Sequence, residues 1–330
     1  MKRMEKVMNK RKVIAIDNGK KNLKAKCGDQ ELVYNNNYSE GHTPDINLLG
    51  ENTFNVTYKN QQYTIGENAR TSDKNIGKGS EIQIIQALTA ITRFLNPSIS
   101  EKVCILYGES VDKYFDDEHK NNIKSLLEGR HIVSIGVDGE EVTYTFTIEE
   151  VHILPEGTGE LLSDFVNKRK GTYYVVDIGG GTINFLTTSG CRPEPEKSTS
   201  FPLGVNNIVS KIIKKAKRKG IDGVEGQEKL IHEYLEDRNK CGSTKLNRII
   251  EDTIIEQFKE LDDKLAGYGV NLHELLKVQP ITFIGGGSEL FKSQIDKLYK
   301  CEVLSTSVVV ENPIMSNVRG FYNYGLIKNL

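Results

Sequence analysis

The sequence has few cysteines, and none of them form a Cys-x-x-Cys pair. The five cysteines are scattered along 330 residues, at Cys27, Cys104, Cys191, Cys241 and Cys301. Paired cysteines are the common mark of zinc sites, and disulfide frameworks belong to oxidising compartments. No secretory signal is recognisable at the start of the sequence. The pattern therefore predicts free thiols in the cytoplasm and argues against zinc ligation.

The sequence also has no excess of positive or negative charge. Long apolar runs are absent as well. Lys and Arg number 44 and Asp and Glu 45, so the formal net charge is −1. Proteins that bind nucleic acid directly usually carry a basic excess or patch. The apolar runs, such as Ile281–Ile284, are far too short to cross a bilayer. We therefore expect neither strong direct DNA binding nor stable membrane insertion.

Two local segments are basic. Residues 1–12, MKRMEKVMNKRK, are either a short amphipathic helix on a membrane surface or a disordered tail, and the second reading is favoured. Residues 211–220, KIIKKAKRKG, contain Ile212 and Ile213, which favours an amphipathic helix with a solvated face over a nucleic-acid site.

Strands and helices alternate along the chain, which predicts an α/β fold. The length of 330 residues favours two lobes. Strands are expected at Lys12–Asp17, Leu23–Cys27, Glu31–Tyr34, Thr53–Thr57, Tyr63–Gly66, Val103–Tyr107, Thr147–Leu154, Tyr173–Ile178, Ile183–Thr188 and Ile281–Ile284. Helices are expected at Ser80–Leu95, Asp116–Leu127, from Pro155 to Asn167, Val205–Lys219, Gly226–Arg238, Thr244–Lys264 and Ser288–Lys300. A polar loop is expected at Asn35–Asn52 and a hairpin turn at Asp138–Gly139.

An internal repeat points to a ligand. VIAIDNGKKNLK at 13–24 and YVVDIGGGTINF at 174–185 share an apolar strand, an Asp at its end, a Gly two positions later and a second apolar strand. Their aspartates, Asp17 and Asp177, are 160 positions apart. Two such hairpins suit a two-lobed protein that grips one ligand from both sides.

The chemistry of each hairpin suits phosphate. Backbone N–H groups of a tight glycine turn can converge on phosphate oxygens, and an Asp that opens the turn can hold Mg²⁺ through water. Lys24 would return from the second strand to the β- and γ-phosphates. Either hairpin alone could equally be an ordinary β-turn.

Two further segments strengthen the interpretation. ITFIGGGSELF at 281–291 predicts a strand, a glycine turn and a helix with Ser288 as its N-cap. Such a junction can pack against a nucleoside or phosphate, or it can be only a tight turn. In HILPEGTGE at 152–160, Glu156 follows Pro155. Its simplest role would be a solvated carboxylate at a helix start.

In this order, the motifs resemble the ATPase domain shared by actin, sugar kinases and heat-shock chaperones. DNGKKNLK resembles the first phosphate loop, LPEG the first connecting segment, DIGGGTIN the second phosphate loop and FIGGGSEL the adenosine motif. NPIMSNVRGFYNYG at 312–325 resembles the second connecting helix. Within this superfamily the chain is most similar to the ParM type of plasmid-segregating filament. Lys20 and Lys21, where small hydroxyl residues are usual, and Asn184, where an acid is common, depart from that pattern.

The resemblance implies an actin-like two-lobed fold, with duplicated ribonuclease H-like subdomains around a nucleotide cleft. It divides the chain into a tail at 1–12, domain I at 13–171, domain II at 172–315 and a C-terminal segment, 316–330, that returns to domain I. Smaller subdomains would occupy about 35–80 and 206–270.

The resemblance also implies the site residues. Glu156 would polarise the attacking water, and Asp17 and Asp177 would lie near Mg²⁺. The phosphates of ATP or GTP would be bound by Asp17, Asn18, Gly19, Lys20, Lys21, Asn22, Lys24, Gly179, Gly180, Gly181 and Thr182. The nucleoside would be bound by Gly285, Gly286, Gly287 and Ser288.

The implied function is nucleotide-driven assembly of a cytoplasmic filament, with hydrolysis faster in the filament than in the monomer. Its partners would be further copies of itself and a DNA-binding adaptor of ParR type, so plasmid DNA would be bound only indirectly. Four other functions compete with this one. A non-catalytic scaffold remains open, a small-molecule kinase lacks a distinct substrate motif, and a chaperone would need a substrate-binding domain after residue 330. The scattered cysteines argue against an activator of radical dehydratases.

Overall fold

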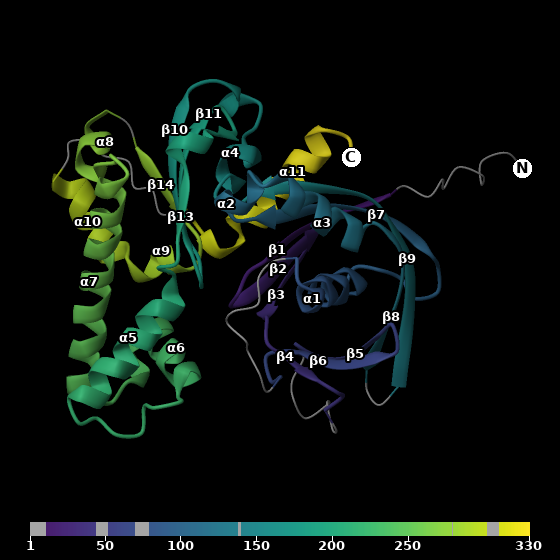
Figure 1. The fold of residues 1–330 in the computed structure, drawn as a ribbon, viewed down its shortest axis with the longest axis horizontal. Helices are drawn as coiled ribbons and strands as arrows, with labels where there is room; N and C mark the ends of the chain where they lie inside the picture. The colour runs from purple at the N-terminus through teal and green to yellow at the C-terminus, as the bar shows by residue number, and fades with distance from the viewer. Residues whose placement is uncertain (1–10, 44–51, 70–78, 138–139, 279, 302–309) are drawn as a thin grey trace, which may run out of the picture. The chain divides into compact units, whose positions relative to one another are not determined.

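The computed structural model describes residues 11–43, 52–69, 79–137, 140–278, 280–301 and 310–330. The chain divides into two compact units (Figure 1). Unit 1 is Met1–Lys170 with Asn317–Leu330, and unit 2 is Gly171–Ser316. The segment after residue 316 thus belongs to the same unit as the first strand.

Unit 1 is built on a nine-stranded mixed sheet in the order β3-β2-β1-β7-β9-β8-β5-β6-β4. The strands are β1 (Lys12–Asn18), β2 (Asn22–Cys27), β3 (Gln30–Asn35), β4 (Tyr38–Glu40), β5 (Thr53–Tyr58), β6 (Gln61–Gly66), β7 (Glu101–Glu109), β8 (Gly129–Val137) and β9 (Glu140–Pro155). The helices are α1 (Glu81–Thr92), α2 (Val111–Tyr114), α3 (Asp117–Leu127), α4 (Gly159–Ser163) and α11 (Ser316–Ile327), with a 3₁₀ turn at Asn167–Arg169.

The two faces of the unit 1 sheet are covered differently. The apolar residues of α1 pack with alternate residues of the strands, such as Ile14 and Ile105, in one core. The intervening residues point to the other face, where α11 packs so closely that a Cβ on Gly325 would lie 2.8 Å from Leu106 Cδ1. A bidentate ion pair at 2.8 Å from Arg319 to Glu31 further attaches α11 to β3.

Unit 2 holds a five-stranded sheet in the order β12-β11-β10-β14, with β13 paired to β11. Its strands are β10 (Thr172–Ile178), β11 (Ile183–Ser189), β12 (Arg192–Pro193), β13 (Thr199–Phe201) and β14 (Ile281–Ile284). Its helices are α5 (Val205–Arg218), α6 (Glu228–Glu236), α7 (Thr244–Gly267), α8 (Leu272–Val278), α9 (Gly287–Leu290) and α10 (Lys292–Cys301), with 3₁₀ turns at Pro195–Lys197, Arg238–Lys240 and Pro313–Met315. Apolar residues of β10, β11 and β14 form one core with residues of α5 and α7.

The sequence repeat is a structural repeat. The antiparallel hairpin β1–β2 continues into a parallel neighbour, β7, and the hairpin β10–β11 has a parallel neighbour, β14. Asp17 pairs with Lys24 across the first hairpin, and Asp177 pairs with Asn184 across the second. The predicted α/β class is confirmed.

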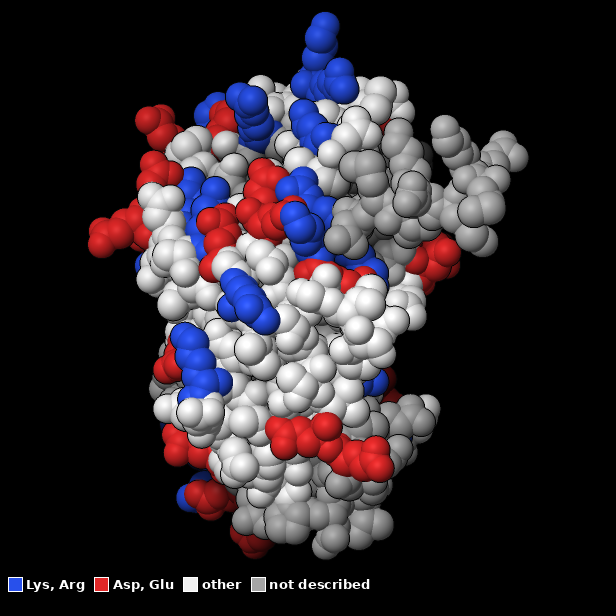
Figure 2. All heavy atoms as spheres, turned by 90° about the vertical axis from the view of Figure 1, so that its right-hand side faces the viewer, with Lys and Arg blue, Asp and Glu red and all other residues white. Residues whose placement is uncertain are grey.

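The basic segment of α5 is an amphipathic helix, as its isoleucines predict. Ile212 is fully buried, while Lys211 and Lys215 form ion pairs with Glu260 and Glu256 of α7. On the face of the molecule in Figure 2, basic and acidic side chains are interspersed. Among the described residues, no helix has both the length and the apolar character needed to cross a membrane.

Some predicted elements differ in extent. The segment expected to be a loop at Asn35–Asn52 contains β4, and β9 is one continuous strand of 16 residues. The helix expected up to Asn167 ends at Ser163, because Phe165 packs edge-on against Tyr324 of α11 instead. The turn at 138–139 and residues 1–10 lie outside the described residues.

The helix expected at Ser288–Lys300 is two helices, and Ser288 is not its N-cap. Helix α9 starts at Gly287, and the Ser288 hydroxyl donates back to the Ile284 carbonyl. The break falls at Phe291, which is fully buried and whose ring centroid lies 5.6 Å from that of Phe258. Core packing of this ring decides where the helix breaks.

Candidate functional site

The turn between β1 and β2, residues 19–21, is here called loop 1. Asp17, the penultimate residue of β1, is only 4% exposed, and Lys24 Nζ lies 3.1 Å from its Oδ2. A Cβ on Gly19 would lie 2.8 Å from the Asn22 carbonyl oxygen, so the turn closes too tightly for a side chain there. The first hairpin thus combines a buried carboxylate, a lysine and a close glycine turn.

Asn36, directly after β3, fixes the shape of loop 1. Its Nδ2 donates to the Gly19 carbonyl at 2.9 Å and to Asn18 Oδ1 at 2.6 Å, and its backbone N–H donates to the Lys21 carbonyl at 2.8 Å. In a trans peptide the C=O and the following N–H point in opposite directions. Because the Gly19 carbonyl points toward Asn36, the Lys20 N–H points away from Asn36.

A buried polar contact with α1 supports this arrangement. Asn18 is fully buried and its Nδ2 donates to the Gln83 carbonyl at 2.8 Å, while Gln86 Nε2 donates to the Asn36 carbonyl at 2.9 Å. Buried amides are favourable only when hydrogen-bonded, so these contacts favour one loop conformation. The Asn18 side chain thus supports loop 1 from the side of α1, while Lys20 is exposed.

Loop 2, residues 179–182 between β10 and β11, is held by the N-terminus of α5. The carbonyls of Gly179, Gly180 and Gly181 accept hydrogen bonds from the backbone N–H groups of residues 205, 206 and 204, at 3.1, 2.8 and 3.3 Å. The N–H groups that follow these carbonyls, those of residues 180–182, must point away from α5. Successive N–H groups on one side of a turn form an anion-binding concavity.

Gly204 makes the contact between α5 and loop 2 possible. A Cβ at this position would lie 2.6 Å from backbone atoms of both Gly180 and Gly181. No real Cβ tolerates such a contact with backbone, so only glycine allows this approach.

Two of the three glycines after β14 pack against the end of β10. Gly285 has a positive φ of 82°, and a Cβ there would lie 2.4 Å from Asp177 Oδ1. A Cβ on Gly287 would lie 2.3 Å from Ile178 Cγ2. Asp177, which is 4% exposed, is thereby held from the side of β14.

Gly285→Ala is expected to destabilise the protein, whereas Gly286→Ala should not. The first substitution combines a strained positive φ with a clash against Asp177, and strain of this kind costs about 1–3 kcal/mol before the clash is added. Gly286 has a φ of −61°, and its Cβ would meet Ile314 at an ordinary 3.7 Å. Urea denaturation of the wild type and of the two variants measures the difference in stability. An equal loss of stability in both variants would contradict the packing described.

Glu156 lies in unit 1 directly after β9, and its backbone is fixed on two sides. Its N–H donates to the Glu109 carbonyl at 2.7 Å, and the next N–H, of Gly157, donates to Asn317 Oδ1 of α11 at 3.0 Å. A Cβ on Gly320 of α11 would lie 1.9 Å from the Gly159 carbonyl oxygen. Glu156 is 7% exposed, which does not fit the solvated helix-start carboxylate considered above.

The hairpins differ at one equivalent position. Lys24 faces Asp17, whereas Asn184 faces Asp177 and its Oδ1 accepts from the Ser200 hydroxyl at 2.5 Å. Only the first hairpin therefore adds a cationic side chain next to its aspartate.

The sequence-derived residues thus form two groups, one in each unit. Unit 1 brings together Asp17, loop 1 and Lys24, and it also carries Glu156, whereas unit 2 brings together Asp177, loop 2 and the glycines at 285–287. Sequence reasoning missed Asn36 and Gly204. Asn36 stands in an Asn-rich stretch without a motif, and the only signal for Gly204 is a glycine immediately before a helix.

Comparison with known proteins identifies the fold. Residues 15–159 match the family model described as the N-terminal domain of actin-like proteins. No curated protein sequence matches the chain. Solved structures do match over almost the whole chain.

An archaeal actin homologue, Ta0583, has a TM-score of 0.72 at 18% identity over 96% of this chain and 99% of its own. The apo pSK41 ParM protein has a TM-score of 0.65 at 20% identity, over 97% of this chain and 98% of its own. The Alp12 filament structure has a TM-score of 0.68 at 19% identity, over 97% and 100%. The chain therefore has an actin-like fold, and its residues 15–159 match the N-terminal domain of actin-like proteins.

Proposed function

We propose that the chain is an actin-like nucleoside triphosphatase that polymerises into dynamic filaments and segregates plasmid DNA. The observation that carries the proposal is the duplicated Asp-Gly hairpin, in which the carbonyls of the turn are held from behind, by Asn36 in loop 1 and by α5 in loop 2. A turn fixed in this way presents N–H groups to an anion without needing to reorganise. ParM and Alp12, which share the fold, support the choice of a filament.

The substrate of the proposal is ATP or GTP. Loop 1, with Lys24, and loop 2 bind its phosphates, and the glycines at 285–287 with Ser288 contact the nucleoside. Two structures of the same fold are described as complexes with ADP, an archaeal actin homologue and a ParM hybrid protein. Neither loop contains a feature that distinguishes adenine from guanine.

The donor set also fits Mg²⁺. Asp17 and Asp177 are hard oxygen donors, both 4% exposed, at equivalent ends of β1 and β10. Mg²⁺ takes one or two carboxylates and keeps several waters, so these two residues would hold it beside the phosphates. Bound there, the ion would neutralise charge that develops on the phosphate oxygens.

Glu156 is the proposed hydrolytic residue. Its carboxylate accepts a hydrogen bond from water and orients it for attack on the terminal phosphate. Phosphoryl transfer depends mainly on positioning and on charge stabilisation, so a carboxylate on a backbone fixed at residues 156 and 157 suits this role. Hydrolysis would then destabilise the filament that nucleotide binding assembled.

The cargo in this proposal is reached through an adaptor. The net charge of −1 and the interspersed charges of Figure 2 give no support to direct DNA binding. A DNA-binding adaptor of ParR type, presenting several copies of itself, would join weak contacts into a stable attachment at a filament end. The filament itself would remain in the cytoplasm.

Light scattering after addition of Mg-ATP or Mg-GTP tests the central claim. We expect scattering to rise with at least one of the nucleotides, to stay flat without nucleotide, and to decline as phosphate is released. Negative-stain microscopy should show filaments at the maximum. Nucleotide binding and phosphate release without any assembly would overturn the filament, and binding without phosphate release would favour a scaffold instead.

A further inference from the structure

Three potential metal ligands meet on the unit 1 sheet, away from loop 1. Cys104 lies on β7, and Glu150 and His152 lie on β9. One ligand atom from each, a sulfur, a carboxylate oxygen and a ring nitrogen, lies within 4.8 Å of the other two. This is a group of three different donor types, and the proposed nucleotide chemistry uses none of them.

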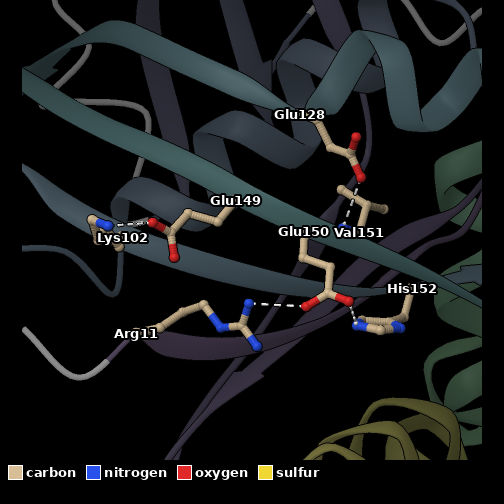
Figure 3. A network of polar contacts seen from close by, with 7 residues as sticks. All are labelled: Arg11, Lys102, Glu128, Glu149, Glu150, Val151 and His152. Carbon is tan, nitrogen blue, oxygen red and sulfur yellow. Dashed lines mark hydrogen bonds and ion pairs between the residues drawn. The ribbon is translucent and has the colours of Figure 1, made fainter.

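A register shift between β7 and β9 creates the cluster. Val103 pairs with Ile148, but Cys104 pairs with Glu150, so Glu149 is an extra residue. The shift keeps Val151 in the core and places Glu150 on the same face as Cys104. The Val151 N–H donates to Glu128 Oε1 at 3.2 Å (Figure 3). Bulges of this kind re-aim side chains, and here one brings three ligands together.

Existing contacts already orient two of the ligands. Arg11 Nη1 lies 2.9 Å from Glu150 Oε2, and His152 Nε2 lies 2.9 Å from Glu150 Oε1 (Figure 3). One carboxylate oxygen of Glu150 thus lies next to the imidazole nitrogen, and the other lies next to the guanidinium of Arg11.

Cys104 completes the set from the buried side. It is fully buried, whereas the side chains of Glu150 and His152 are 43% and 29% exposed, so a ligand could arrive from solvent past those two residues. As a metal ligand, Cys104 would bind as the thiolate, so metal binding would release its proton.

We propose that Cys104, Glu150 and His152 bind one Zn²⁺ ion. Zinc takes sulfur, nitrogen and carboxylate oxygen together, and three protein ligands plus water make a complete tetrahedral site. Metal–ligand bonds of about 2.0–2.3 Å require the ligand atoms to approach by roughly 1 Å, which side-chain rotation can provide. Zinc would fasten β7 to β9 at the bulge, a few residues before Glu156, and would do so whether or not the chain hydrolyses nucleotide.

Titration of metal-free protein with Co²⁺, followed by displacement with Zn²⁺, tests the site. We expect one Co²⁺ per chain, with thiolate-to-metal absorption, and displacement by one Zn²⁺. Glu150→Gln and His152→Gln should each weaken Zn²⁺ binding by at least roughly 10–100-fold, the scale on which even outer partners of metal sites act. Cys104→Ser should remove the thiolate absorption.

Glu149→Gln is the matched control. Glu149 is the neighbour of Glu150 on β9 but pairs with Lys102 (Figure 3), so its loss should leave the affinity unchanged. Absence of Co²⁺ binding by the wild type, equal loss in Glu149→Gln and Glu150→Gln, or thiolate absorption that persists in Cys104→Ser would each overturn the site. Should Cys104→Ser not fold, the half-exposed His152 and Glu150 variants still decide the outcome.

Discussion

Glu156→Gln is expected to slow phosphate release by roughly 10²-fold while nucleotide binding and filament assembly continue. The substitution keeps the size of a side chain that is 7% exposed, and the bonds that fix the segment come from backbone groups of residues 156 and 157. The structure should therefore survive, and only the carboxylate that orients water is lost. Because assembly needs bound nucleotide and disassembly needs hydrolysis, the variant's filaments should last longer than those of the wild type.

Phosphate release and light scattering, recorded on the same sample, measure both effects. Glu160→Gln, four residues further along in α4, is the control, and both of its rates should match the wild type. A folded Glu156→Gln protein that releases phosphate and loses its filaments at wild-type rates would remove Glu156 from the hydrolytic role.

The hairpins and glycine turns could be predicted from the sequence because their pattern is local. Each hairpin begins with a run of apolar residues and leads into a turn that demands glycine, and each copy of the repeat is only twelve residues long, 13–24 and 174–185. The same reasoning placed α1 and α7 within a few residues of their observed bounds. The superfamily fold followed from the order of these local motifs.

What the sequence could not predict depends on distant contacts. Asn36 shapes loop 1 across a strand, and Gly204 matters only because α5 approaches loop 2. The N-cap prediction for Ser288 was wrong because packing of the glycines against β10 moves the helix start to Gly287. A turn motif in the sequence predicts the backbone conformation of the turn itself, but it does not predict which distant residues pack against that turn.

The proposed zinc site shows the same limit for cysteine spacing. The scattered cysteines argue against zinc only if ligands come close together in sequence, as paired cysteines do. Cys104 reaches Glu150 and His152 through the pairing of β7 with β9, and the bulge at this pairing decides which glutamate it meets. Neither strand alone contains that information.

Asp177→Asn is expected to lower hydrolysis by roughly 10²–10³-fold, corresponding to the several kcal/mol that a bound metal contributes to phosphoryl transfer. Asn has the size of Asp, which matters because Gly285 packs against the carboxylate, where a Cβ would lie 2.4 Å from Oδ1. The variant therefore removes the charge and keeps the packing, whereas Asp177→Ala would change both. Asp222→Asn, at an exposed position of unit 2, controls for the loss of one negative charge.

Titration of a fluorescent nucleotide, with Mg²⁺ or with a chelator, separates metal binding from folding. In the wild type and in Asp222→Asn the chelator should weaken nucleotide binding. In Asp177→Asn the chelator should have a much smaller effect, because one of the two carboxylates that would hold Mg²⁺ is gone. The unfolding midpoint in urea should stay near that of the wild type, unlike that of Gly285→Ala, in which packing is disturbed. A folded Asp177→Asn protein whose nucleotide affinity falls with the chelator as far as that of the wild type would remove Asp177 from the Mg²⁺ site. The equivalence of the two hairpins would then make Asp17 the next residue to replace.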